Sequence, residues 1–120
     1  MNIKNMFVTV RDNYVIHQVE KIKLPPFSEE GIARYSIVFS GRVQHVGFRL
    51  EVCELAKKLR LTGWCENLEN GDVRAEIQGA DSRIQYLIAF MESLKRIKIK
   101  HKTIEKLPIN EGETSFVKRG

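Results

Sequence analysis

The apolar pattern of residues 35–117 constrains the fold of this chain more than any other feature. Apolar side chains recur at every second position in residues 35–39 and 73–77, which is typical of strands with one face on a core. Between and after these segments the spacing changes to three and four, which predicts helices beginning near Phe48 and Asp81. One chain therefore alternates between strand and helix patterns.

Three further segments complete the order of elements. Residues 64–68 form a strand pattern that leads into Asn70-Gly71, a strong signal for a hairpin. Residues 97–109 return to alternation, and residues 114–117 can supply a short terminal strand. The predicted order is β-α-β-β-α-β plus that strand. We expect an α+β domain with a ferredoxin-like βαββαβ sandwich, in which two helices pack on one face of an antiparallel sheet.

The segment before this pattern is predicted to be separate from it. Residues 7–10 and 14–19 are rich in β-forming residues and flank a short polar turn, so they indicate a β-hairpin. Pro25-Pro26 then indicates a connector, because adjacent prolines continue neither a strand ladder nor a helix. We predict an N-terminal extension over residues 1–34 and a single domain over residues 35–120.

Composition limits the classes of partner. A length of 120 residues fits one domain, and the net charge of +5 favours anionic partners without choosing among them. Cys53 and Cys65 form no disulfide framework or metal-binding pattern. No run of apolar residues is long enough to span a bilayer, and residues 1–10 do not resemble a signal peptide. We expect a cytoplasmic protein with free thiols, no membrane partner, no metal and no cofactor.

The most informative stretch is GRVQHVGFR, residues 41–49, where a strand runs through a glycine-containing turn directly into a helix. Such a junction presents unpaired N–H groups at a helix start, where the helix dipole also favours negative charge. Arg49 lies in the first helical turn, and its guanidinium matches phosphate oxygens. Alternatively, Arg49 is an exposed helix residue and the glycines only make a turn. A cation is unfavourable at a helix start, however, which favours a functional reason.

This loop resembles the signature of the acylphosphatases, in which glycine–x–Val-Gln-Gly-Val–x–Phe-Arg is usual. The stretch GWCENLENGDV, residues 63–73, resembles their second signature, and the likeness extends over about residues 35–119. By this resemblance Arg49 is the catalytic arginine that binds the phosphoryl group, and Asn67 positions the attacking water. The resemblance also implies that the phosphate oxygens are held by the main-chain amides of Val43, Gln44, His45, Val46 and Gly47.

The resemblance implies an acyl-phosphate phosphohydrolase. It implies a small acyl phosphate as the substrate, inorganic phosphate as a product, and no cofactor or metal. We expect a monomer. The chemistry is consistent with these residues: a carboxylate is a good leaving group, so in-line positioning of water and neutralisation of the phosphoryl charge are the main requirements.

His45 departs from the family pattern, which has glycine at that position. If the backbone there is left-handed, histidine costs about 1–2 kcal/mol and misaligns one amide; otherwise its side chain simply lies beside the pocket. We expect the substitution to be tolerated.

Two other functions remain open from the residues. The first is a phosphate-binding or regulatory module that has lost turnover through His45. The second is an RNA-binding sheet, which the basic run at residues 95–102 would suit, although such a run is usually a solvated face. Residues 72–77 lack the aromatic residues on which RNA-binding sheets stack bases, so we expect no nucleic-acid partner.

Overall fold

A computed structural model describes residues 2–29 and 31–120. The elements are, in order, α1 (Ile3–Glu20), β1 (Ile32–Arg42), α2 (Phe48–Lys58), β2 (Thr62–Asn67), β3 (Val73–Ala80), α3 (Asp81–Ser93), β4 (Lys98–Leu107) and β5 (Phe116–Lys118). From β1 onward this is the order expected from periodicity, so the ferredoxin-like α+β prediction is confirmed. The first strand begins at Ile32, before the predicted start at Tyr35.

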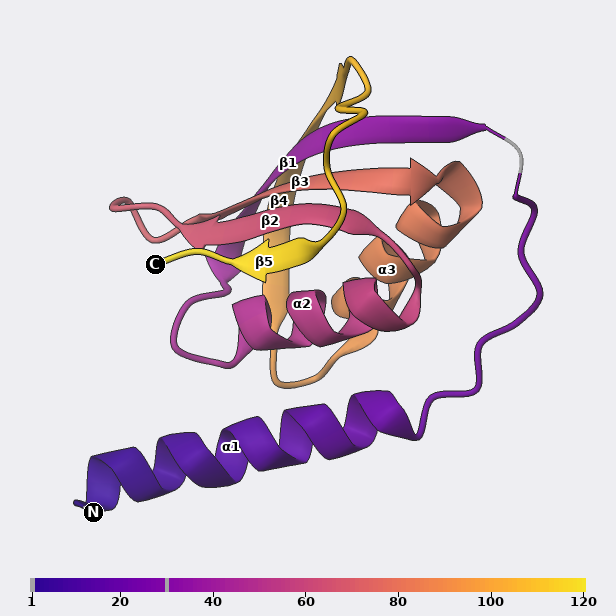
Figure 1. Ribbon diagram of the computed structural model, residues 1–120. Helices are drawn as coiled ribbons and strands as arrows, with labels where there is room; N and C mark the ends of the chain where they lie inside the picture. The colour runs from indigo at the N-terminus through magenta and orange to yellow at the C-terminus, as the bar shows by residue number, and fades with distance from the viewer. Residues whose placement is uncertain (1, 30) are drawn as a thin grey trace.

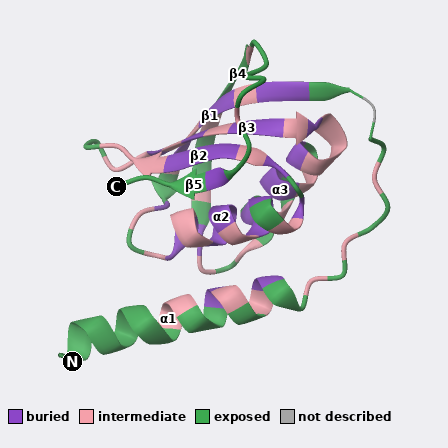
Figure 2. Cartoon of the chain, in the orientation of Figure 1, coloured by how far each residue is buried: buried purple, intermediate pink, exposed green. Residues whose placement is uncertain are grey.

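The sheet has the strand order β4-β1-β3-β2-β5. The first four strands pair antiparallel, whereas β5 runs parallel to β2, so the terminal strand makes the sheet mixed. Helices α2 and α3 cover one face of the sheet (Figure 1). Between them lies a continuous apolar core, which includes Phe39 and Ile77 from the sheet and Phe48, Leu55 and Leu87 from the helices. Figure 2 shows these layers as the buried part of the molecule.

The opposite face of the sheet is covered in part by the segment between β4 and β5. Arg34 of β1 is buried there, and its guanidinium binds Glu113 of that segment (2.8 Å) and Glu76 of β3 (3.0 Å). A third bond runs from Arg34 Nη1 to Gln78 Oε1 (3.1 Å). These contacts tie the segment before β5 to the sheet, and so fix where the last strand lies.

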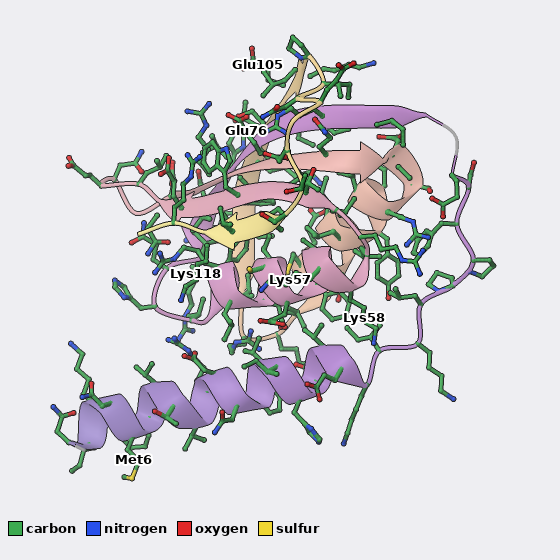
Figure 3. The ribbon with its side chains drawn as sticks, viewed as in Figure 1. Met6, Lys57, Lys58, Glu76, Glu105 and Lys118 are labelled. Carbon is green, nitrogen blue, oxygen red and sulfur yellow. The ribbon has the colours of Figure 1, made fainter. Side chains whose placement is uncertain are left out.

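The hairpin predicted for residues 7–19 is wrong, because these residues form the single helix α1. Val15 and Val19, four positions apart, are buried, and α1 packs on α2 (Figure 1). Asn2 caps the start by accepting a hydrogen bond from Asn5 N (2.8 Å). At the other end Lys58 of α2 donates to Val19 O and Glu20 O, both at 2.9 Å (Figure 3). Caps and packing override the β propensity of these valines, which is a weak preference.

The first half of α1 extends past the body of the protein. Residues 2–10 are exposed in Figure 2, and the labelled Met6 points away from α2 in Figure 3. Within the described part of the chain, no helix combines the length and apolar character needed to cross a bilayer.

Candidate functional site

The loop between β1 and α2 has the backbone of an anion-binding turn. His45 (φ 62°) and Gly47 (φ 80°) are both left-handed, and Gly47 is the N-cap of α2 without a side-chain cap. Within residues 2–29 and 31–120, none of the main-chain N–H groups of residues 43–47 donates to a protein acceptor. Left-handed residues alternating with others make successive N–H groups converge on a concavity that suits an anion. The helix dipole of α2 adds positive potential at the same place.

Because His45 has a left-handed backbone, the first alternative applies: the histidine is strained, and is not simply an ordinary residue beside the pocket. A residue with a Cβ is strained there, by about 1–2 kcal/mol relative to an ordinary conformation. The loop nevertheless keeps the conformation, and the histidine side chain is exposed beside the site. We therefore expect the substitution to be tolerated at a cost in stability.

We expect His45→Gly to stabilise the protein by about 0.5–1 kcal/mol, because glycine adopts the left-handed region freely but has more freedom to lose on folding. Urea unfolding measures the change, and phosphate affinity should stay within about twofold, a shift of less than 0.5 kcal/mol. Ser40→Gly, at a strand residue without a positive φ, is the control and should destabilise. A His45→Gly variant less stable than the parent would contradict strain at this residue.

The loop lies beside a cavity of about 200 Å³, which both predicted catalytic residues line. Arg49, from the first turn of α2, and Asn67, the last residue of β2, both line it. The lining residues from the loop and the adjoining helix are Val43, His45, Gly47, Phe48 and Leu50, with Lys118 from β5 and Val8, Arg11 and Asp12 from α1. Gln44 and Val46, predicted as loop residues, do not line the cavity.

The Arg49 side chain is held by the end of the chain. Its Nη1 donates to the backbone oxygens of Arg119 and Gly120. In the described part of the chain Nε and Nη2 have no acceptor, so they remain available to a ligand. One edge of the guanidinium is thus fixed and the other is free for an oxyanion, which is the fork geometry that arginine offers phosphate.

The position of Asn67 relative to the loop is fixed by Gln44. The Gln44 amide donates to Leu68 O and Asp72 O, both at 2.8 Å, and so ties the loop to the turn that follows Asn67. No described residue accepts or donates a hydrogen bond at the Asn67 side chain. A carboxamide with unused donor and acceptor atoms is suited to hold a water molecule. The sequence motif implies a role only for the main-chain amide of Gln44, and no sequence signal indicates the role of its side chain.

Arg96 also supports the loop, although its place in the basic run at residues 95–102 predicts a solvated side chain. Its Nε donates to Val46 O (2.7 Å) and its Nη2 to Oε1 of Glu51 (3.1 Å). Glu51 is fully buried in α2, and its N–H bonds Gly47 O (3.0 Å). Burial raises the pKa of the Glu51 carboxyl, although Arg96 opposes the shift. The sequence signal for the Arg96–Glu51 pair was a glutamate in the first turn of a helix, on the face that is otherwise apolar.

We expect Arg96→Ala to weaken phosphate binding about tenfold and to lower the free energy of unfolding by about 3 kcal/mol, because it frees Val46 and leaves a buried carboxyl unpaired. Calorimetric titration with phosphate and urea unfolding measure the two effects. Adding Glu51→Gln should restore much of the stability but not the affinity, since the loop contact stays lost. Recovery of both together would contradict a positioning role for Arg96.

Cys65 lies in the core beneath the site. It is fully buried in β2, and burial raises the pKa of its thiol to about 12, although the nearby Arg49 opposes the shift. The group is a neutral thiol near pH 7, which is a poor nucleophile. Among the described residues no three histidine, cysteine, aspartate or glutamate side chains cluster as metal ligands would.

Comparison with known proteins agrees with this fold and loop. The acylphosphatase family profile matches residues 35–118. An acylphosphatase of Clostridium beijerinckii is 40% identical over 87 residues, which cover 69% of this chain and 93% of that protein. The crystal structure of acylphosphatase from Bacillus subtilis matches with a TM-score of 0.68 and 27% identity, over 75% of this chain and 100% of that one. An acylphosphatase from Coxiella burnetii gives the same TM-score and identity over 79% of this chain and 100% of its own.

These matches define a ferredoxin-like hydrolase domain. The chain belongs to the acylphosphatase family, and the family and enzyme class predicted from the two motifs are confirmed. Helix α1 lies outside the matched residues.

Proposed function

We propose that this protein hydrolyses the carboxyl–phosphate bond of small acyl phosphates, giving a carboxylate and inorganic phosphate. One observation carries the proposal: Arg49 and Asn67 line the same cavity, beside a loop whose amides have no protein acceptor among the described residues. Its family membership supports the same reaction class.

The phosphoryl group binds against the main-chain amides of the loop at residues 43–47, of which Val43, His45 and Gly47 line the cavity, and the free edge of the Arg49 guanidinium neutralises its charge. The Asn67 carboxamide holds a water in line with the bond to be broken. The water oxygen attacks phosphorus, the bond from phosphorus to the acyl oxygen breaks, and the carboxylate leaves with the bonding electrons. A phosphate oxygen takes the proton from the water. Positioning and charge neutralisation supply the rate, as is general in phosphoryl transfer.

The test is hydrolysis of benzoyl phosphate by the purified full-length chain in buffer with EDTA, followed by loss of substrate absorbance. We expect turnover above the rate of spontaneous hydrolysis, and competitive inhibition by inorganic phosphate. Phosphate binding without turnover would identify a binding or regulatory module instead. Salt-sensitive RNA binding with neither property would indicate the RNA-binding alternative, and would contradict our expectation of a small-molecule partner.

A further inference from the structure

Helix α1 contributes one wall of the cavity. Five residues of α1 recur at helical spacing and share one face: Val8, Arg11, Asp12, Val15 and Val19. Val15 and Val19 are buried, while the other three line the cavity with Arg49 and Asn67. A segment outside residues 35–118, the part that matches the family, therefore completes the site in this chain.

Arg11 lies directly against the phosphate loop. A Cβ at Gly47 would be 3.2 Å from Arg11 Nε and 3.4 Å from Val15 Cγ2, so α1 approaches the loop as closely as glycine allows. Asp12 orients the guanidinium, since its Oδ1 accepts from Arg11 Nε (3.1 Å) and Nη2 (2.9 Å). Nη1 has no acceptor in the described part of the chain. The arginine is held in place with donor capacity unused.

The cavity has two cations besides the arginine assigned to the phosphoryl group. Arg11, Arg49 and Lys118 are cationic, and Asp12 is the single acidic side chain among the lining residues of this cavity. Arg49 is assigned to the phosphoryl group, which leaves Arg11 on the α1 side for the acyl part of a substrate. A free guanidinium N–H at a partly enclosed site is suited to a carboxylate.

Building on the proposed function, we propose that Arg11 is a specificity-determining residue, and that the preferred substrates are short acyl phosphates whose acyl group ends in a carboxylate. Arg11 Nη1 donates to this carboxylate while the phosphoryl group lies in the loop.

The test compares succinyl phosphate with butyryl phosphate, which has a chain of the same length and no carboxylate. We expect the full chain to have a higher kcat/KM for succinyl phosphate. Arg11→Gln should lower that value about tenfold, the loss of one charge-assisted hydrogen bond, and leave butyryl phosphate within about twofold. Arg11→Lys should keep part of the preference. Lys4→Gln is the control, because it removes one charge from the exposed first turn of the same helix.

The outcomes separate this inference from the proposed function. Turnover of butyryl phosphate without any preference for succinyl phosphate leaves the proposed function standing and overturns the role of Arg11. Equal losses for both substrates in Arg11→Gln would mean that Arg11 only packs the loop, which also overturns it. If the parent protein hydrolyses neither substrate, the proposed function itself fails, and the inference with it.

Discussion

Replacing Arg49 with glutamine is expected to lower kcat/KM for benzoyl phosphate by about 1,000-fold or more, the range seen when an arginine that neutralises phosphoryl charge is removed. Glutamine keeps similar bulk and hydrogen-bonding atoms but lacks the charge and the fork. Because Nη1 of Arg49 also donates to the backbone oxygens of Arg119 and Gly120, the C-terminal residues lose a contact as well. The contact is exposed, so we expect little change in stability.

Lys57→Gln is the matched control for Arg49→Gln. Lys57 is an exposed cation on the same helix, and its ion pair with Glu54 is long, at 4.0 Å. It changes the net charge equally but lies outside the cavity. We expect near-normal turnover from this variant, and for Arg49→Gln a loss both of turnover and of inhibition by phosphate. If Arg49→Gln retained phosphate binding at the parent affinity, the assignment of Arg49 to the phosphoryl group would be contradicted.

The fold from β1 onward was predictable because each element has one face on the core. Burial of one face imposes period 2 on β3, where Val73, Ala75 and Ile77 are fully buried, and helical spacing on α3, where Ile84, Leu87 and Met91 are. The Asn70-Gly71 turn added a local signal for the hairpin between β2 and β3. Such signals lie within a few residues of one another, so the sequence alone carries them.

Helix α1 was not predictable by the same route, because only two of its residues, Val15 and Val19, are buried. Its exposed face carries Ile3, Phe7 and Val10, so apolar residues occur all round the first half and the helical period is obscured. β-Branched residues then favoured a strand pattern. The segment is helical because of the local Asn2 cap and because of its contact with α2, including Lys58, and only the second of these depends on residues far along the chain.

The candidate site likewise contains residues that the sequence predicts and residues that only the structure reveals. Arg49 was predicted from the strand–turn–helix junction and from the resemblance of residues 41–49 to the family signature, and Asn67 from the resemblance of residues 63–73 to the second signature. The supporting contacts are long-range: Gln44 reaches residues 68 and 72, and Arg96 reaches residues 46 and 51. Arg11 joins the cavity from a segment whose predicted structure was wrong. No spacing in the sequence links these residues, so they become visible only in the folded chain.

Replacing Asn67 with alanine is expected to lower kcat by about 100–1,000-fold, the usual cost of losing one hydrogen-bonding group that acts in the transition state. The affinity for inorganic phosphate should remain within about twofold, since the loop amides and Arg49 are intact. Asn67 pairs with Val73 through its backbone and makes no side-chain hydrogen bond within the described chain, so stability should barely change. Rapid-mixing kinetics with benzoyl phosphate and calorimetric titration with phosphate separate the two effects.

Asn70→Ala is the control for this experiment because Asn70 lies in the turn after β2, outside the cavity. Its Oδ1 accepts from Asp72 N (3.0 Å), so its loss should cost about 1 kcal/mol of stability while kcat stays near normal. The two asparagines thus separate water positioning from turn formation. Loss of phosphate affinity in Asn67→Ala, in parallel with kcat, would show that the carboxamide binds the phosphoryl group itself. A normal kcat would instead place the attacking water elsewhere in the cavity, and Asn67 would then have no part in the chemistry.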